Sequence, residues 1–554
     1  MKPQAYTDSL PHVQTDWSQT GTALVFTSIL LVGLMVVVPV AGWAGMTIGA
    51  PKLVALLGAI AVVGGFYGLS VLLLRQLPLG LFVSLLVLST FAANIPLASN
   101  EYIKPFPGSL GPQLWLVQLP LIGLIGYFLF TDRFNRSEIT SAEYVYAGFV
   151  GWTLASALLT SAPRQDVALY FSLLMLQGFL VFSLSIRAVT ANTIDLRTAL
   201  YVLGVTVSGH ALFGIIQLVN QGPVGLTYLG ESIDYNQVAY EPLGLSNQVI
   251  VSGFTGHGYV LVALSLLTVP VLVTYAMQTR SWRRLIALVD VVFLIAIIRL
   301  STSDAGRGAG LLIMFMLLTG VACVWMLNSR TISLDIPVFT EYQRSVSHSA
   351  SHLFTTAAAM CLSLLILFYP SSKAGATSNE GTTPSSGTTG GATGGAPSEA
   401  LSVPFFDLSN FGIRIQQYLV GFDLFVQYPL FGIGGANFAF VATDYGIRMK
   451  PNSSVAHALH NIYFALLAET GLPSLVLYVS TIGLVIYAGW RVINAQHNYR
   501  LFVIAFLIGM VGFFAFGFWT HAPIDRITAV LPFWILAGCL VGTANQERHS
   551  FKQK

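Results

Sequence analysis

The sequence predicts an all-α, polytopic integral membrane protein with about fourteen transmembrane helices, because apolar segments of roughly 20 residues recur along its whole length. Of its 554 residues, 55% are hydrophobic and 9% are charged, and the mean hydropathy is +0.72. A soluble protein would carry about 25% charged residues. The net charge of +3 is too small to indicate a nucleic-acid partner, so membrane lipids are the expected surroundings.

The expected spans begin near Thr22, Lys52, Leu79, Pro112, Glu143, Ala168, Leu196, Thr255, Arg284, Arg307, His352, Leu472, Leu501 and Ile524. Lysine and arginine concentrate in the cytoplasmic connections of membrane proteins. Applied to the short connections here, this rule places both termini in the cytoplasm. We therefore expect a multi-pass protein of the plasma (inner) membrane, with two long loops, 219–254 and 370–455, on the extracytoplasmic side.

Two membrane regions and a tail are expected. Residues 1–300 form the N-terminal set of helices with outer loop 219–254, and residues 301–545 form a second set around the larger outer loop 370–455, which carries short helices. Within that loop, 374–400 consists almost entirely of small and polar residues. Such a segment cannot bury enough apolar surface to offset its ordering entropy, so we expect a disordered insertion. Residues 546–554 form the cytoplasmic tail.

The first candidate on the outer side is Arg307, at the start of an expected span and flanked by Gly306 and Gly308. Helix N-terminal amides and a guanidinium group together suit a phosphate or diphosphate. The alternative is an arginine that anchors the helix among lipid headgroups.

The second candidate is Arg414, near the start of an expected amphipathic helix in the larger loop. Apolar residues recur there with helical spacing, and Tyr428-Pro429 ends the helix before a glycine-rich turn at 432–435. Such turns usually only reverse the chain, so this one is a weak phosphate signal. The apolar positions are Ile415, Leu419, Phe422 and Val426.

The third candidate is a helix expected over residues 457–470, which Gly471 and Pro473 end. His457 and Asn461 would share one face by their four-residue spacing, and His460 and Tyr463 would lie on the adjacent face. A single histidine on an apolar helix is more often a packing residue than a catalyst. Two histidines with Asn461 and Glu469 at a membrane boundary favour a functional cluster, because such groups are costly to desolvate without partners.

Taken in order, these segments resemble the O-antigen ligase and O-antigen polymerase superfamily. The resemblance rests on an outer junction, an arginine-led helix with its closing turn, and two motifs that follow it. The matching residues are Gly306-Arg307-Gly308, Arg414, Pro429 to Gly435, His460-Asn461-Ile-Tyr463 and Glu469-Thr-Gly471. The resemblance is clearest from about Thr302 to Pro473.

The resemblance implies a glycosyltransferase similar to the lipid-carrier enzymes of C type. Its donor would be a polyprenyl-diphosphate-linked glycan, such as one on undecaprenyl diphosphate, and its acceptor a lipid, a glycan or a protein. The resemblance assigns acid/base chemistry to His460 with Glu469, and diphosphate binding to Arg307 and Arg414. Weaker substrate-binding candidates are His457, Asn461, Tyr463, His257 and His210.

One departure from the family pattern concerns the first outer loop, which usually carries an arginine. This chain has Gly253-Phe-Thr-Gly-His-Gly258 there and no arginine between Asn220 and Phe254. A third cationic contact to the diphosphate is therefore not expected from this loop. For that reason His257 and His210 are included among the candidates.

The expected reaction is ligation of the glycan to an acceptor hydroxyl with inversion. The sequence offers no Asp-x-Asp motif or His/Cys cluster for a metal, so we expect neither metal nor cofactor. One alternative is a polymerase that extends the lipid-linked glycan for a surface polysaccharide. Another is a transporter or flippase for that glycan, which Asp290 inside a span would favour.

Overall fold

The structure is a computed structural model, and it describes residues 17–47, 54, 57–58, 61–65, 68, 77–96, 113–131, 139–226, 229–231, 235–236, 248–249, 251–279, 282–300, 304–329, 350–368, 411–447, 458–495 and 499–552. The N-terminal helices are α1 (Trp17–Thr47), α3 (Leu77–Leu88), α5 (Gln118–Phe130), α6 (Ser141–Leu159), α7 (Gln165–Thr190) and α8 (Leu196–Asn220). The later long helices are α9 (Gly258–Gln278), α10 (Trp282–Leu300), α11 (Asp304–Ser329), α13 (Ala350–Phe368), α17 (Leu472–Ala495), α18 (Arg500–Gly517) and α20 (Ile527–Lys552). The described residues also form four shorter helices, namely α14 (Phe411–Gln427), α15 (Phe438–Val441), α16 (Ile462–Thr470) and α19 (Ala522–Asp525).

The fold is helical, as expected, but the described residues also contain two short antiparallel ladders. Strand β1 (Asn94–Pro96) pairs with β2 (Gln113–Trp115), and β3 (Tyr235–Asn236) pairs with β4 (Gln248–Val249). The first ladder corrects the span expected from Pro112, because the helix there begins only at Gln118.

Seven helices in the described part of the chain are long and apolar enough to cross a membrane, and four shorter apolar helices accompany them. The seven windows are Gln19–Val38, Gln165–Thr190, Leu196–Asn220, Gly258–Gln278, Leu472–Ala495, Arg500–Gly517 and Ile527–Arg548. The chain is a multi-pass membrane protein, and the number fourteen stays a prediction. The expected insertion at 374–400 lies outside the described residues, whereas most of the expected tail continues helix α20 to Lys552.

Helix α20 is the centre of the bundle, and every position in its apolar window is buried. It packs closely on α7 because it presents glycines there. A side chain at Gly538 would collide with the carbonyl oxygen of Phe182, and one at Gly542 would meet the backbone of Ile186 at 3.0 Å. Small residues permit this approach between membrane helices, where dispersion contacts replace a hydrophobic driving force.

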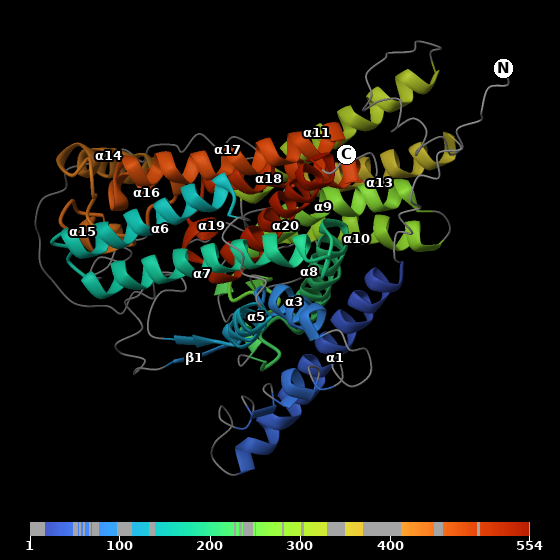
Figure 1. The fold of residues 1–554 in the computed structure, drawn as a ribbon, viewed down its shortest axis with the longest axis horizontal. Coiled ribbons are helices and arrows are strands. Elements are labelled where there is room, and N and C mark those ends of the chain that lie inside the picture. The colour runs from blue at the N-terminus through green and yellow to red at the C-terminus, as the bar shows by residue number, and fades with distance from the viewer. Residues whose placement is uncertain are drawn as a thin grey trace, which may run out of the picture.

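Two helical hairpins place the functional segments at one end of the bundle. Helices α6 and α7 form the first hairpin, and a buried ion pair between Arg187 and Glu143 joins its open end. Helix α16 turns back into α17 at Gly471, whose φ of +82° favours glycine and whose Cβ position is filled by the carbonyl of Leu430. Figure 1 shows α14, α15 and α16 gathered with the ends of α6 and α7 at this end.

Candidate functional site

His460 lies just before α16 and not within it, which corrects the expected helix over 457–470. Asn461 is in an extended conformation (φ −163°, ψ 119°), and its side chain accepts hydrogen bonds from the backbone N–H groups of Tyr463 and Phe464 at 2.9 and 3.0 Å. Asparagine is a favoured N-cap because its side chain satisfies these otherwise unpaired donors. The helix therefore begins at Ile462, so Asn461 lies on no helical face, and His457 lies outside the described residues.

Helix α14 holds His460 from its side chain and from its backbone. The Nδ1 atom of His460 lies 3.2 Å from Oε1 of the buried Gln417, and the Tyr418 hydroxyl donates to the His460 carbonyl at 3.2 Å. Because Oε1 can only accept, Nδ1–H is the donor. In the neutral ring the basic nitrogen is then Nε2.

A segment that the sequence reading did not single out, residues 518–526, lies beside His460. The rings of His460 and His521 are 5.3 Å apart between centroids, with an interplanar angle of 69°. Nε2 of His521 lies 3.4 Å from Oδ2 of Asp525, one turn further along. Burial raises the pKa of the Asp525 carboxyl to about 7, against the opposing charge of Arg526. The structure thus adds a histidine–carboxylate pair to the expected histidine.

The carbonyl oxygen of Phe518 joins residues 518–526 to helix α14 and to Asn461 at the start of α16. That oxygen accepts a hydrogen bond from Nδ2 of Asn461 at 3.1 Å, and it shares the Tyr418 hydroxyl proton, at 3.2 Å, with the His460 carbonyl. In the sequence, the feature that could have indicated this segment is the polar run at 520–526, immediately before the last span. It was missed because the expected span began at Ile524 and took Asp525 and Arg526 into the membrane, whereas α20 begins at Ile527.

Two arginines and a further histidine lie in the neighbourhood of His460. The guanidinium carbon of Arg414 lies 5.8 Å from the centroid of the Trp519 ring, close enough for a cation–π contact. His257 caps α9, with its Nδ1 accepting from the Tyr259 N–H at 3.1 Å. Burial lowers the pKa of His257 to about 3, and the positive charges of Arg526, His521 and His460 act in the same direction. These groups therefore share one neighbourhood, which we call the His460 cluster: Arg414, His460, His521, Asp525, Arg526 and His257.

Arg307 lies at the same end of the bundle by connectivity. Helix α9 leaves the His460 cluster at Gly258, and short connections return the chain through α10 to the start of α11. Within α11, Ile313 packs against Gly512 of α18, whose last residue, Gly517, contacts Ile462. Arg307 is half-buried in the first turn of α11.

Glu469 lies at the opposite end of α16 from His460, nine residues on, or roughly 13 Å along the helix axis. Its buried carboxylate accepts hydrogen bonds from the N–H groups of Ala436 and Phe438 at 2.8 and 3.1 Å. Burial nevertheless raises its pKa to about 8. The structure therefore brings Glu469 together with the turn that follows α14, and not with His460. The glycines of that turn allow close approach: Gly432 (φ +62°) lies against the backbone of Glu469.

His210 and Tyr463 both make contacts that stabilise the fold. His210 is buried in α8, where Nδ1 accepts from the Phe254 N–H at 3.2 Å and Nε2 lies 2.7 Å from the Thr90 hydroxyl. The Tyr463 hydroxyl donates to the Phe514 carbonyl at 3.5 Å, and its ring packs on Phe518 at 4.5 Å. His210 thus positions the loop before α9, whereas Tyr463 attaches α16 to α18.

A groove of about 740 Å³ lies beyond the far end of α14, between the α6–α7 connection and the segment after α15. Tyr428 and Tyr445 expose half or nearly half of their surface there. The Tyr445 hydroxyl and the Gln427 amide both donate to the Asp423 carboxylate, at 3.2 and 2.8 Å. Gln417 and Gln427 are ten residues apart on α14, so the groove lies roughly 15 Å from the His460 contact along that helix.

Among the residues that the structure describes, no group of three or more His, Cys, Asp or Glu side chains is arranged to hold a metal ion. In the transporter alternative, Asp290 was the intramembrane charge of interest. It accepts a hydrogen bond from the Ser208 hydroxyl of α8. A polar group on a neighbouring helix therefore satisfies this buried carboxyl group, and no transported ligand is needed to explain it.

Comparison with known proteins gives one family match. The model of the O-antigen ligase family matches residues 255–479. This range includes His257, Arg307, Arg414, His460 and Glu469, but it ends before the 518–526 segment. No curated protein matches the chain. The match confirms the resemblance drawn from the sequence motifs: residues 255–479 are similar to the O-antigen ligase family.

Proposed function

We propose that the protein is a ligase that transfers a glycan from a polyprenyl-diphosphate carrier to an acceptor hydroxyl at the His460 cluster. The observation that carries this proposal is the position of His460: a histidine of the matched region lies among Arg414, Arg526 and His521 at one end of a membrane bundle. A diphosphate leaving group needs fixed positive charge close to a proton acceptor, and this cluster provides both.

In the proposed reaction, the acceptor oxygen attacks the anomeric carbon as the bond from that carbon to the diphosphate oxygen breaks, with inversion. The acceptor's proton goes to Nε2 of His460, since Gln417 fixes Nδ1–H. Arg414, Arg526 and Arg307 stabilise the negative charge that develops on the diphosphate. Asp525 orients His521 against His460. No metal or cofactor takes part in this scheme, and Glu469 has a positioning role.

The proposed topology follows from the basic connections. Both termini lie in the cytoplasm of a cell with a plasma (inner) membrane, and the His460 cluster lies on the extracytoplasmic side. The groove beside Tyr445 then faces outward on the same side, where its tyrosines, amide and carboxylates suit sugar hydroxyls of the glycan.

Product analysis tests the ligase against the polymerase. Purified protein receives lipid-diphosphate glycan with and without a candidate lipid or protein acceptor. Glycan attached to the new acceptor, with release of the lipid diphosphate, supports the ligase. Longer glycans on the same carrier would establish the polymerase instead. Movement of intact lipid-linked glycan across a vesicle membrane, without either product, would establish the transporter.

A further inference from the structure

Helix α14 has an exposed apolar stripe on the side that points away from the protein. Its buried residues, among them Gln417 and Leu424, face α16 and His460. Roughly half a turn away, four apolar side chains recur with helical spacing and expose between 41% and 65% of their surface. A contiguous apolar surface of this kind marks a contact with a partner or with a membrane. The four residues, which we call the α14 stripe, are Ile415, Leu419, Phe422 and Val426.

The rest of the exposed surface of α14 is polar. Gln416, Asp423 and Gln427 are also exposed, about a quarter of a turn around the helix from the α14 stripe. Asp423 and Gln427 contact the Tyr445 hydroxyl at the groove described above. A helix with one apolar and one polar exposed face lies in the plane of a membrane surface, with its apolar face in lipid. The two faces of α14 therefore indicate lipid on one side and water on the other.

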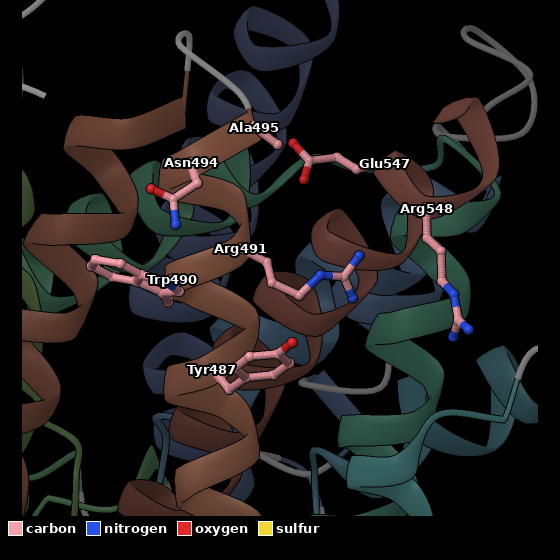
Figure 2. Close-up of a pocket in the computed structure, with 7 residues that line it drawn as sticks. All are labelled: Tyr487, Trp490, Arg491, Asn494, Ala495, Glu547 and Arg548. Carbon is pink, nitrogen blue, oxygen red and sulfur yellow. The ribbon is translucent and has the colours of Figure 1, made fainter. Parts of the chain in front are cut away.

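Helix α17 provides a lipid-facing surface beside α14. Among the seven apolar windows in the described residues, the one in α17 is the least buried, with 39% of its positions inside the protein. Its exposed side chains include Leu472 and Val476 at one end and Tyr487 and Trp490 near the other. Figure 2 shows Trp490 directed away from α20, whereas Arg491 points toward it. Exposed apolar and aromatic side chains on a membrane-crossing helix face lipid.

The segment after α14 connects the α14 stripe to this surface of α17. The Leu472 N–H donates to the Pro429 carbonyl at 2.9 Å, and the next residue, Leu430, exposes 59% of its surface. Exposed apolar residues therefore follow one another from Val426 through Leu430 to Leu472. Leu430 also lines the groove beside Tyr445, which thus opens at the edge of the apolar surface. The α14 stripe is continuous with the part of the protein that lipid already covers.

We propose that α14 is docked on the membrane, with the α14 stripe inserted in the leaflet on the side of the His460 cluster. The occupant is the lipid surface itself, because the stripe continues the lipid-facing surface of α17. Amphipathic helices of this kind bury their apolar face about 5–10 Å into the boundary between headgroups and acyl chains. Gln417 and Tyr418 of α14 hold His460, so the depth of α14 also sets the depth of His460.

Spin labelling of the full-length protein in vesicles of phosphatidylethanolamine and phosphatidylglycerol tests this position. The native cysteines other than the buried Cys539 are first replaced by alanine, and this background should take up no label. Nitroxides at Leu419→Cys and Val426→Cys report on the α14 stripe, and Gln416→Cys is the matched control on the polar face. We expect collisions with oxygen, which concentrates in lipid, to exceed those with a water-soluble nickel complex severalfold at the two stripe positions. The reverse is expected at the control position.

A photoreactive lipid tests the same contact without any substitution. A phosphatidylcholine with a diazirine in its acyl chain is added to the vesicles and irradiated, and the adducts are located by mass spectrometry. We expect adducts on the α14 stripe as well as on the exposed face of α17, which serves as the internal control. Adducts on α17 but not on α14 would overturn the proposal, even if a labelled variant failed to fold.

Three results of the spin-label experiment would also overturn it. Access of the nickel complex to the stripe positions equal to that at Gln416→Cys would place the whole exposed surface of α14 in water. Low access of both reagents to the stripe would mean that protein covers it. Magnetic coupling between labels at Leu419→Cys on two molecules would identify that protein as a second copy of the chain.

Discussion

The imidazole rings of His460 and His521 lie edge to face, 5.3 Å apart between centroids, although α16, α17 and α18 separate them in the sequence. His521 is in turn 3.4 Å from the Asp525 carboxylate. His460, the proposed proton acceptor, therefore lies beside a histidine–carboxylate pair, His521 and Asp525, from outside the matched family region. The predictions below test what each member of this arrangement contributes.

Arg414 should contribute to donor binding through its charge and its planar shape. We expect Arg414→Gln to lower kcat/KM for the lipid-linked donor by about 100-fold, or ~2.7 kcal/mol of transition-state stabilisation. Arg414→Lys should recover only part of this loss, because lysine cannot pair with the diphosphate in a bidentate manner or stack on Trp519 as arginine does. Equal activity of the Gln variant and the unaltered enzyme in steady-state assays would exclude this role.

Ionisation of Asp525 should produce the rise in the rate of glycan transfer on the acidic side of its pH profile. Burial raises its pKa to about 7, so the carboxylate is mainly protonated at pH 6 and mainly ionised at pH 8. If the ionised form orients His521, transfer should rise through about pH 7. In Asp525→Asn, transfer should be lower and that limb should disappear. A variant that keeps the same limb would assign the titration to another group.

Glu469 should act on stability more than on chemistry. Its folded-state pKa of about 8 is above the ordinary value of 4.5, so the folded protein binds more protons between these pH values. Its contribution to stability is therefore greatest below about pH 4.5 and is lost as the pH rises through about 8. We expect Tm to fall over this range, and to fall less in Glu469→Gln. Glu469→Ala should be the least stable, because it leaves the Ala436 and Phe438 N–H groups buried without an acceptor.

The groove beside Tyr445, beyond the far end of α14, should distinguish donors with long glycans from donors with short ones. Tyr445→Ala removes an exposed ring and a hydroxyl that donates to Asp423. We expect KM for donors with many sugar units to rise severalfold, while donors with one or two units react as before. Tyr487→Ala is a matched control, because Tyr487 is similarly exposed but lies at the other end of the bundle. Identical effects on long and short donors would contradict the assignment.

Much of the architecture could be predicted from the sequence, because membrane helices are encoded by long apolar segments. The amphipathic helix led by Arg414 was also predicted correctly, but the direction of its apolar stripe was not obvious. Leu419, Phe422 and Val426 are all more than 50% exposed, while Gln417 faces inward to bind His460. Helical periodicity shows that α14 has an apolar face, but it does not show which face of the helix packs against the rest of the protein.

The site itself was only partly predictable. His460 and Arg414 stood out because titratable residues at a membrane boundary are costly. Asn461 looked like a helical residue, since spacing does not distinguish a residue within a helix from its cap. His521 and Asp525 could not be joined to His460 at all, because their contact depends on how α18 and α19 pack beside α9.

The most direct test of the central claim is glycan transfer by purified His460→Ala, with Tm measured to establish that it is folded. General acid/base catalysis contributes about 100- to 10,000-fold, so we predict a loss of at least that order in kcat. His257→Ala serves as the comparison: burial lowers the pKa of His257 to about 3, so its neutral ring stays neutral and its loss should affect kcat less. Undiminished transfer by folded His460→Ala would contradict the proposed site.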